Sequence, residues 1–211
     1  LAARVCAEAR LVNAGQSCIA AKRFIVVESV RTEFEERLVA EFEAARVGDP
    51  LEESTTMGPL ARADLRLELH AQVTRAIAGG AACLLGGRLP MGPGFYYPPT
   101  LLTDVGAGME VFDTETFGPV ASIVAARDET EAVDLANHSS FGLGAAVFTR
   151  DIERGLHLAA RHLEAGNCFV NAPVRSDPRL PFGGIRDSGW GRELGEFGQR
   201  AYVNVKSVVA P

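Results

Sequence analysis

The 211-residue chain lacks the features that mark membrane, secreted and nucleic-acid-binding proteins. No apolar run approaches the ~20 residues of a membrane-spanning helix, so no membrane partner is expected. The opening residues, LAARVCAEAR, show no cationic region followed by a long apolar stretch, and no secretory signal is visible. The 21 Lys and Arg are scattered and outnumbered by 27 Asp and Glu, giving a net charge of −6, which argues against a nucleic-acid partner.

Cysteine and histidine are too sparse and too dispersed to suggest a disulfide framework or a metal centre. The chain contains no C-x-x-C pair, which argues against dense disulfides and against a zinc knuckle. Such spacing favours a reducing compartment, and we expect a cytoplasmic location. The histidines fall in helical patterns or at their ends, so no metal ligand set is predicted. The residues concerned are Cys6, Cys18, Cys83, Cys168, His70, His138, His157 and His162.

What the sequence does contain is a regular alternation of strand and helix patterns. The strand patterns are apolar nearly throughout, and amphipathic patterns separate them. Strands of this kind are buried on both faces, so the predicted fold class is α/β, with a mostly parallel open sheet and helices on both faces. Ser29 is predicted to cap one helix, and Asp128 with Glu131 to cap another. The expected strands or extended segments are 24–29, 83–85, 96–105, 120–126, 144–149 and 167–171; the expected helices are 29–46, 61–78, 128–135 and 152–163.

Two segments depart from this alternation. Ala172–Gly195 is rich in Gly, Pro, Arg and Asp and has no period, and a loop of that length is usually functional. Tyr202–Val209, near the end of the chain, alternates in the manner of a strand. A lone strand at a terminus needs a partner edge, either in this chain or in another. Because no partner strand is evident nearby, we expect it to pair with another subunit.

Cys18, in NAGQSCIAAKRF, is the first candidate for chemistry. A thiol becomes a nucleophile when its pKa is depressed or competing water is excluded. Gly15 permits a tight turn before it, and Lys22 and Arg23 place cations within a few residues. Composition alone leaves open that Cys18 is an inert core residue.

Two further segments carry motifs. DTETFGPVAS (Asp113–Ser122) combines a carboxylate with an aromatic ring, which suits a polyhydroxyl group with a flat ring above it; the alternative is a turn that only enters a strand. PFGGIRDSGWGRELGEFG (Pro181–Gly198) is glycine-rich, so its backbone can approach a ligand or another chain closely. It lacks the G-x-G-x-x-G order after a strand, so it is not a dinucleotide fingerprint.

Together these segments resemble the aldehyde dehydrogenase superfamily. NAGQSCIAAKRF is similar to the family's nucleophile motif, TETFGPV to its E-x-F-G-P motif, and PFGGIRDSGWGRELG to its P-F-G-G-x-K-x-S-G-x-G-R-E-L-G loop. The intervening stretches VGDP, MGPL, YYPPTLL and FGLGAAVFT fit as well, so the resemblance covers nearly the whole chain. Among members of this superfamily, the sequence is most similar to bacterial succinate-semialdehyde dehydrogenases.

The resemblance implies roles for individual residues. Cys18 would be the catalytic nucleophile, forming a thiohemiacetal and then a thioester. Glu115 would bind the nicotinamide ribose of NAD or NADP, and Phe117 would pack beside the nicotinamide ring. Substrate-binding positions follow in the same way, lining the aldehyde pocket or holding the far carboxylate of the substrate. They are Asn171, Ser176, Phe182 and Arg179.

One departure bears on the substrate. Some of these enzymes carry a carboxylate-binding arginine six residues before the nucleophile, and this position is Val12 here. Arg175 or Arg179 could substitute, since a guanidinium pairs well with a carboxylate; the alternative is that both are solvated loop charges. The family's usual lysine in the glycine-rich loop is Arg186, which we expect to be a neutral change.

A second departure is length. The resemblance implies a chain about twice as long, whose amino-terminal half carries a Rossmann-like cofactor domain, an oxyanion asparagine and a general-base glutamate. Because the chain starts with Leu1 inside a helical pattern, we expect it to begin within a longer polypeptide. Residues 1–195 are then the catalytic domain, and residues 196–211 a tail with an oligomerisation strand that makes a homo-oligomer. The competing hypotheses are a truncated, non-catalytic fragment and a CoA-acylating relative.

Overall fold

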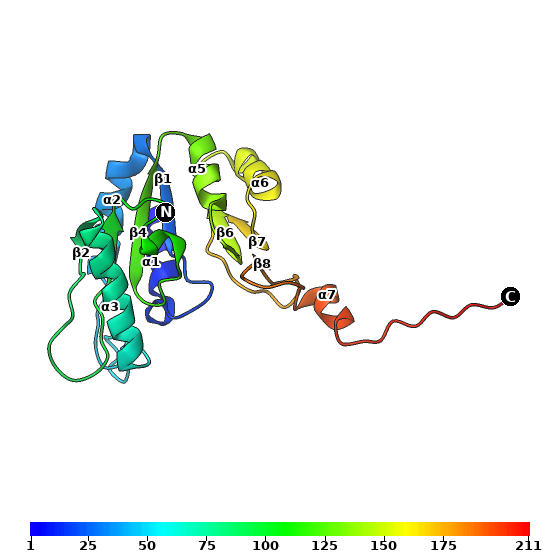
Figure 1. Ribbon diagram of the computed structural model, residues 1–211, viewed down its shortest axis with the longest axis horizontal. Helices are drawn as coiled ribbons and strands as arrows, with labels where there is room; N and C mark the ends of the chain where they lie inside the picture. The colour runs from blue at the N-terminus through cyan, green and yellow to red at the C-terminus, as the bar shows by residue number, and fades with distance from the viewer.

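The computed structural model describes residues 1–211, and its largest sheet has four strands in the order β1-β4-β3-β2 (Figure 1). β1, β4 and β3 run parallel, with Arg23 opposite Ser122 and Thr100 opposite Val120, and β2 is antiparallel to β3. The predicted α/β class with a mostly parallel sheet is therefore confirmed. The bounds are β1 Arg23–Val27, β2 Ala82–Leu85, β3 Thr100–Thr103 and β4 Val120–Ala126.

Helices cover both faces of this sheet because successive strand residues point to opposite sides. Leu101 belongs to a core cluster that contains side chains of α1 and α2, whereas Leu102 belongs to a second cluster with α3 and α4. Ile123 and Val124 of β4 divide in the same way. The helices are α1 Ala2–Leu11, α2 Glu28–Glu43, α3 Ala63–Ala78 and α4 Glu110–Asp113.

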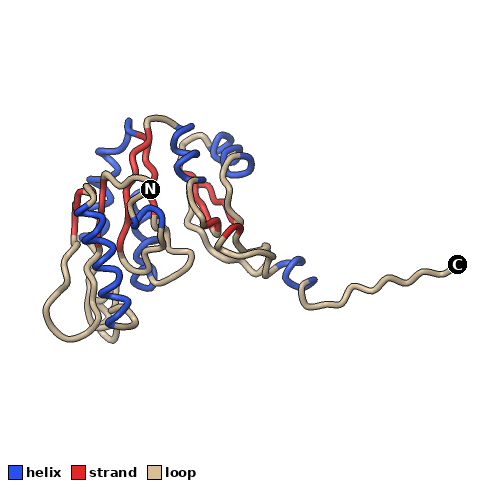
Figure 2. Tube along the Cα trace, viewed as in Figure 1, coloured by secondary structure: helices blue, strands red, loops and turns tan.

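The remaining strands form two small sheets of their own (Figure 2), whereas the sequence suggested a single sheet. β6 (Gly144–Val147) and β7 (Asn167–Val170) are parallel, and β5 (Phe141–Gly142) pairs antiparallel with β8 (Ile185–Arg186). The connection between β6 and β7 contains α6, which spans Ile152–Arg161 and contacts both strands.

Helix α5 (Glu129–Asn137) lies against both β1 and β4. Its carboxyl end is held by Arg23 of β1, whose guanidinium donates to the carbonyls of Leu135, Ala136 and His138 at 3.2, 3.0 and 2.9 Å. A cation at this end of a helix also opposes the negative pole of the helix dipole.

The helix caps were predicted with mixed success. Asp128 does cap α5, since its carboxylate accepts from the Glu131 N–H at 2.9 Å. The Ser29 cap is wrong, because α2 begins at Glu28, follows directly on β1 and has Val27 as its N-cap without a side-chain hydrogen bond. The N-cap position is thus the last residue of β1, and it holds the apolar Val27.

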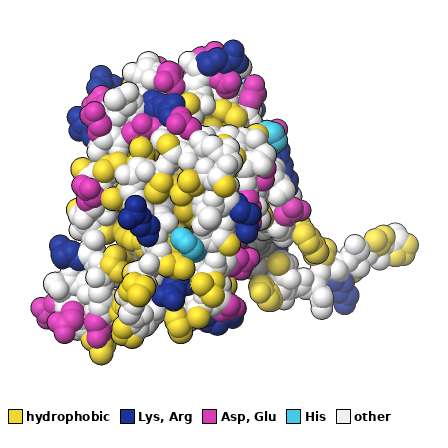
Figure 3. Space-filling view, turned by 60° about the vertical axis from the view of Figure 1, so that its left-hand side comes forward, with side chains coloured by type: hydrophobic (Ala, Val, Ile, Leu, Met, Phe, Trp, Pro, Cys, Tyr) yellow, Lys and Arg dark blue, Asp and Glu magenta, His cyan; other side chains and the backbone are white.

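The chain ends in α7 (Gly195–Arg200) and an extended tail that projects away from the body (Figures 1 and 3). Residues 201–211 form no strand, and Val205 and Val209 are 96% and 89% exposed. Tyr202–Val209 pairs with no strand of its own chain, and its expected pairing with another subunit stays a prediction. On the face shown in Figure 3, acidic and basic side chains are interspersed with hydrophobic ones. None of the helices has the length and hydropathy of a membrane-spanning segment.

Candidate active site

The nucleophile candidate lies on a turn between η1 (Val12–Gly15) and β1. The Ala20 N–H closes the turn on the Ser17 carbonyl at 3.0 Å, and Cys18 is exposed on it. The backbone N–H of Cys18 donates to no acceptor within the chain. Cys6, by contrast, is buried in α1, and burial raises the pKa of its thiol to about 12. Cys18 is therefore accessible both to a thiol reagent and to a substrate, and Cys6 is not.

The residues before Cys18 fix the path of the turn. Asn13, Ala14 and Gly15 all have left-handed backbone conformations, with φ of 50°, 52° and 72°. The Asn13 amide donates to the Gln16 carbonyl at 3.0 Å, and the Gln16 side-chain oxygen accepts from the Ala61 N–H at 2.8 Å. Non-glycine residues in this region are strained and persist only when their surroundings hold them. These side-chain contacts supply that support.

The second motif lies directly against this turn. A side chain at Gly15 would overlap the Gly118 carbonyl oxygen, so the two loops are in backbone contact. On the Gly118 loop, Glu115 is exposed and Phe117 is 39% exposed, whereas Thr116 between them is buried. The loop therefore presents a carboxylate and an aromatic ring to solvent beside the Cys18 turn.

Cys18 and Glu115 line the same cleft. Its volume is about 1020 Å³, and 27 of its 44 lining residues are hydrophobic. Its lining includes residues of β1, of α5 and of β6. A mostly apolar cleft with a few polar groups is the usual form of a small-molecule site.

Lys22 is a third polar group of this cleft. Its ammonium donates to the Thr114 carbonyl at 2.6 Å and lies 5.2 Å from the centre of the Phe141 ring. Burial and the neighbouring Arg23 lower the pKa of Lys22 to about 8, and the Glu115 carboxylate partly opposes this effect. Lys22 thus places a titratable cation beside the Glu115 loop.

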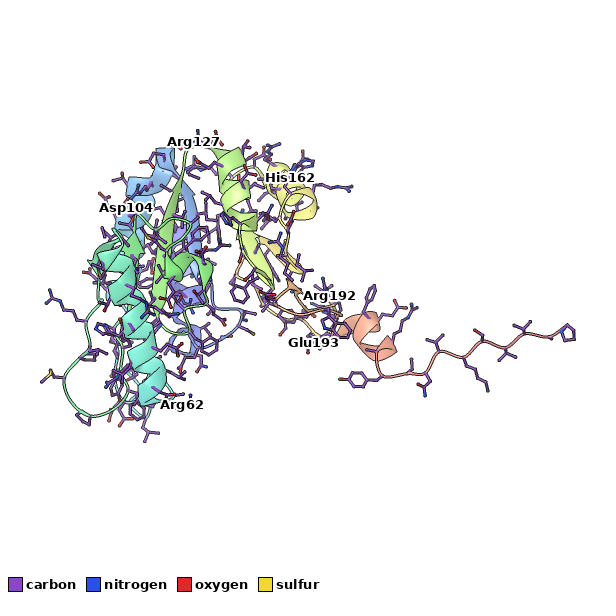
Figure 4. The ribbon with its side chains drawn as sticks, in the orientation of Figure 1. Arg62, Asp104, Arg127, His162, Arg192 and Glu193 are labelled. Carbon is purple, nitrogen blue, oxygen red and sulfur yellow. The ribbon has the colours of Figure 1, made fainter.

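The four predicted substrate residues lie apart from this cleft, although their neighbours Pro173 and Val174 line it. The Asn171 amide holds Thr149, accepting from its N–H at 2.9 Å and donating to its carbonyl at 2.8 Å. The Phe182 backbone pairs with Glu193, which lies beside Arg192 just before α7 (Figure 4).

The remaining two, Ser176 and Arg179, are exposed on the 172–195 loop. The Nε and Nη2 atoms of Arg179 donate to the two carboxylate oxygens of Asp177, at 2.9 and 2.6 Å. This pairing holds the pKa of Asp177 well below its usual range. Arg175 makes no ion pair within the chain. Val12, at the position of the absent arginine, is 48% exposed.

Sequence reasoning missed Arg10, which is 1% exposed and contacts both motif loops. The signal was present in the pattern, because Ala3, Cys6 and Ala7 place the buried stripe of α1 at helical spacing and Arg10 continues it. A charge on an apolar stripe is rare unless it has a partner.

No group of three or more His, Cys, Asp and Glu side chains in the structure is arranged to hold a metal ion.

The fold is α/β, and it holds an exposed cysteine on a turn against a Glu-x-Phe-Gly-Pro loop. The profile of the aldehyde dehydrogenase family matches residues 1–208, and the chain belongs to that family.

Its relatives include succinate-semialdehyde dehydrogenases. The chain is 48% identical over 208 residues to the succinate semialdehyde dehydrogenase [NAD(P)+] Sad of Escherichia coli, covering 99% of this chain and 45% of the relative. It is 50% identical over 207 residues to a probable succinate-semialdehyde dehydrogenase [NADP(+)] of Synechocystis, covering 98% and 45%. The chain thus spans a little under half the length of the curated relatives it matches.

Solved structures agree with this assignment. The succinic semialdehyde dehydrogenase of Streptococcus pyogenes, crystallised with NADP+, superimposes with a TM-score of 0.95 at 37% identity, over 100% of this chain and 46% of that one. Betaine aldehyde dehydrogenase of Staphylococcus aureus with NAD+ gives 0.91 at 32% identity, over 95% and 41%. The arrangement of elements is therefore that of a family member over the matched part.

Proposed function

We propose that the chain supplies the catalytic part of an NAD(P)+-dependent aldehyde dehydrogenase that oxidises succinic semialdehyde to the acid. The observation that carries the proposal is the placement of Cys18, exposed on a turn and lining one cleft with Glu115. In this proposal residues 1–195 are the catalytic domain and residues 196–211 a tail.

Cys18 performs the covalent step. Its thiolate attacks the aldehyde carbon and forms a thiohemiacetal, whose oxygen carries the negative charge. The Cys18 backbone N–H, which has no acceptor in the chain, is free to donate to that oxygen. NAD(P)+, when bound, supplies the acceptor for the hydride that leaves this carbon. The resulting thioester on Cys18 is hydrolysed by water, which releases the carboxylic acid and restores the thiol.

The residues present fit the nicotinamide end of the cofactor. Glu115 and Phe117 are both exposed on a loop in backbone contact with the Cys18 turn. A carboxylate accepts from ribose hydroxyls, and an aromatic ring packs against a flat heterocycle. The chain spans 45% of its Escherichia coli relative, and we propose that the adenine and pyrophosphate bind outside the 211 residues. Relatives named for NAD(P)+, NADP+ and NAD+ support either dinucleotide.

The substrate proposal rests on the named relatives and on the 172–195 loop. We propose that this loop, with Asn171, Ser176 and Phe182, lines or supports the far end of the aldehyde pocket. Arg179 already pairs with Asp177, whereas Arg175 makes no ion pair and has its guanidinium available. Of the two, Arg175 is thus the better candidate to meet the substrate carboxylate, and Arg179 would have to leave Asp177 to do so.

Alkylation of the four thiols tests the pocket. Iodoacetamide near neutral pH should modify exposed Cys18 rapidly, and succinic semialdehyde should slow this modification because it occupies the same sulfur. Peptide mass spectrometry follows each thiol separately. Cys83, which is also exposed, is the internal control and should not be protected. Butanal, which lacks the carboxylate, should protect less at equal concentration. Equal loss of label at Cys18 and Cys83 would contradict a formed pocket.

Product analysis separates the CoA-acylating alternative in the full-length enzyme that carries this domain. An acid formed at the same rate with and without CoA supports hydrolysis of the thioester. An acyl-CoA product, formed only with CoA, would show that the thioester is transferred instead.

We also propose that Tyr202–Val209 pairs with a second subunit. The segment alternates like a strand, is exposed along its length and has no partner in its own chain. Deleting Tyr202–Pro211 should lower the mass measured by light scattering at equal protein concentration. Deleting only Ala210 and Pro211, outside the alternating segment, is the matched control. An unchanged mass in the longer deletion would argue against this interface. A chain that self-associates, but whose Cys18 is not protected by succinic semialdehyde, would support the alternative of a non-catalytic fragment.

A further inference from the structure

Arg10 is the most deeply buried charged side chain of the fold, with 1% of its surface exposed. It extends from the last turn of α1, on the stripe that packs against the sheet. One terminal nitrogen donates to the Gly15 carbonyl at 2.6 Å, and the other to the Thr116 carbonyl at 3.4 Å. A single guanidinium therefore spans the Cys18 turn and the Glu115 loop.

This placement is costly for a residue with only a packing role. Burial lowers the pKa of Arg10 to about 10, with the nearby Glu115 carboxylate opposing the effect. Its Nε has no hydrogen-bond partner, and neither does the buried hydroxyl of Thr116. An apolar side chain of similar volume would remove the desolvation cost at this position. The contacts to two loop carbonyls are what the charge adds.

Lys22 contacts the same loop at the residue that precedes Glu115. Its ammonium donates to the Thr114 carbonyl, so cations contact the backbone on both sides of Glu115. Both cations are anchored on segments that flank Cys18, Arg10 before it and Lys22 after it. The Glu115 loop is thus attached at two points to the polypeptide that carries the thiol.

We propose that Arg10 is a positioning residue that fixes the Cys18 turn and the Glu115 loop at one separation. The inference rests on the proposed function, in which the aldehyde carbon on Cys18 must face a nicotinamide held by the Glu115 loop. Arg10 touches neither reacting group and acts through the carbonyls of Gly15 and Thr116. Fixed geometry of this kind is what makes a covalent step and a hydride transfer efficient.

Amide hydrogen exchange of the 211-residue chain tests the coupling without any assay of activity. In Arg10→Met, exchange of residues 13–20 and 114–118 should accelerate together, by about tenfold relative to β4, because both loops lose their shared donor. Arg10→Lys keeps a charged donor and should recover part of the protection. Leu38→Ala is the matched control, since it opens a cavity in a core cluster that contains no residue of 13–18 or 114–118, and it should raise exchange without singling these segments out.

The same variants are then alkylated with and without succinic semialdehyde. Arg10→Met should lose protection of Cys18, and Arg10→Lys should restore part of it. If wild-type Cys18 is not protected while the paired exchange effect is present, the proposed function fails and the coupling stands. Uniform exchange in Arg10→Met, as in Leu38→Ala, or acceleration of only one loop would overturn the role of Arg10. Should Arg10→Met fail to fold, Arg10→Gln and Arg10→Lys carry the comparison.

Discussion

The purified 211-residue chain, mixed with NAD+ or NADP+ and succinic semialdehyde, is expected to oxidise the aldehyde at least ~10⁴-fold more slowly than a full-length relative. The resemblance places the cofactor domain, an oxyanion donor and the general base in sequence that these residues do not contain. The chain covers 45% of its Escherichia coli relative, and its glycine-rich segment is a loop around β8 rather than a strand-turn-helix phosphate site.

The measurement is the rise in absorbance of the reduced cofactor at equal enzyme concentration. The Escherichia coli relative provides the full-length reference, and Cys18→Ser in the 211-residue chain provides the background. Turnover within tenfold of the reference would show that residues 1–211 hold a complete site. A residual rate that disappears in Cys18→Ser would show that the thiol retains part of its reactivity without the other groups.

Gly15→Ala should be the most destabilising small change at the site. Gly15 has a φ of +72°, and an added Cβ would overlap the Gly118 carbonyl oxygen, which is backbone and cannot turn away. Left-handed strain of about 1–2 kcal/mol and overpacking of about 1–3 kcal/mol together predict a loss of about 3 kcal/mol in the free energy of unfolding.

Urea unfolding measures this loss, and the chain offers a matched control. Gly108 has a φ of +90°, but a Cβ there meets nothing within 4 Å. Gly108→Ala therefore carries only the conformational strain and should cost about 1 kcal/mol. Equal losses in the two variants would mean that the two motif loops are not in the close contact described.

The central strand was predictable with its bounds. Val120–Ala126 is apolar except for Ser122 because it is buried between two helical layers, and its composition reflects this burial. The Asp128 cap was predictable for a similar reason, since a cap is a local contact. The division of the strands between separate sheets was not, because pairing depends on partners distant in sequence. The tail strand stays a prediction, because alternation alone supplies no edge and the expected edge belongs to another subunit.

In the candidate site, too, residues within local motifs were predictable and residues defined by distant contacts were not. Cys18 and Glu115 stand in long, ordered motifs, and the structure brings both to one cleft. Arg10 has no motif, and only its position on a buried stripe distinguishes it from an exposed arginine. The roles of Asn171 and Arg179 remain proposals, because their side chains are engaged with Thr149 and Asp177 rather than with the cleft.

The projecting tail has a practical consequence for any preparation of this chain. Residues 204–211 make no backbone hydrogen bond, so a protease can draw this segment into its active site without unfolding anything. Lys206 lies within it, and trypsin-like cleavage there would remove Ser207–Pro211 and cut through the alternating segment. Intact-mass analysis therefore has to precede light scattering, since clipped material would imitate the engineered deletion.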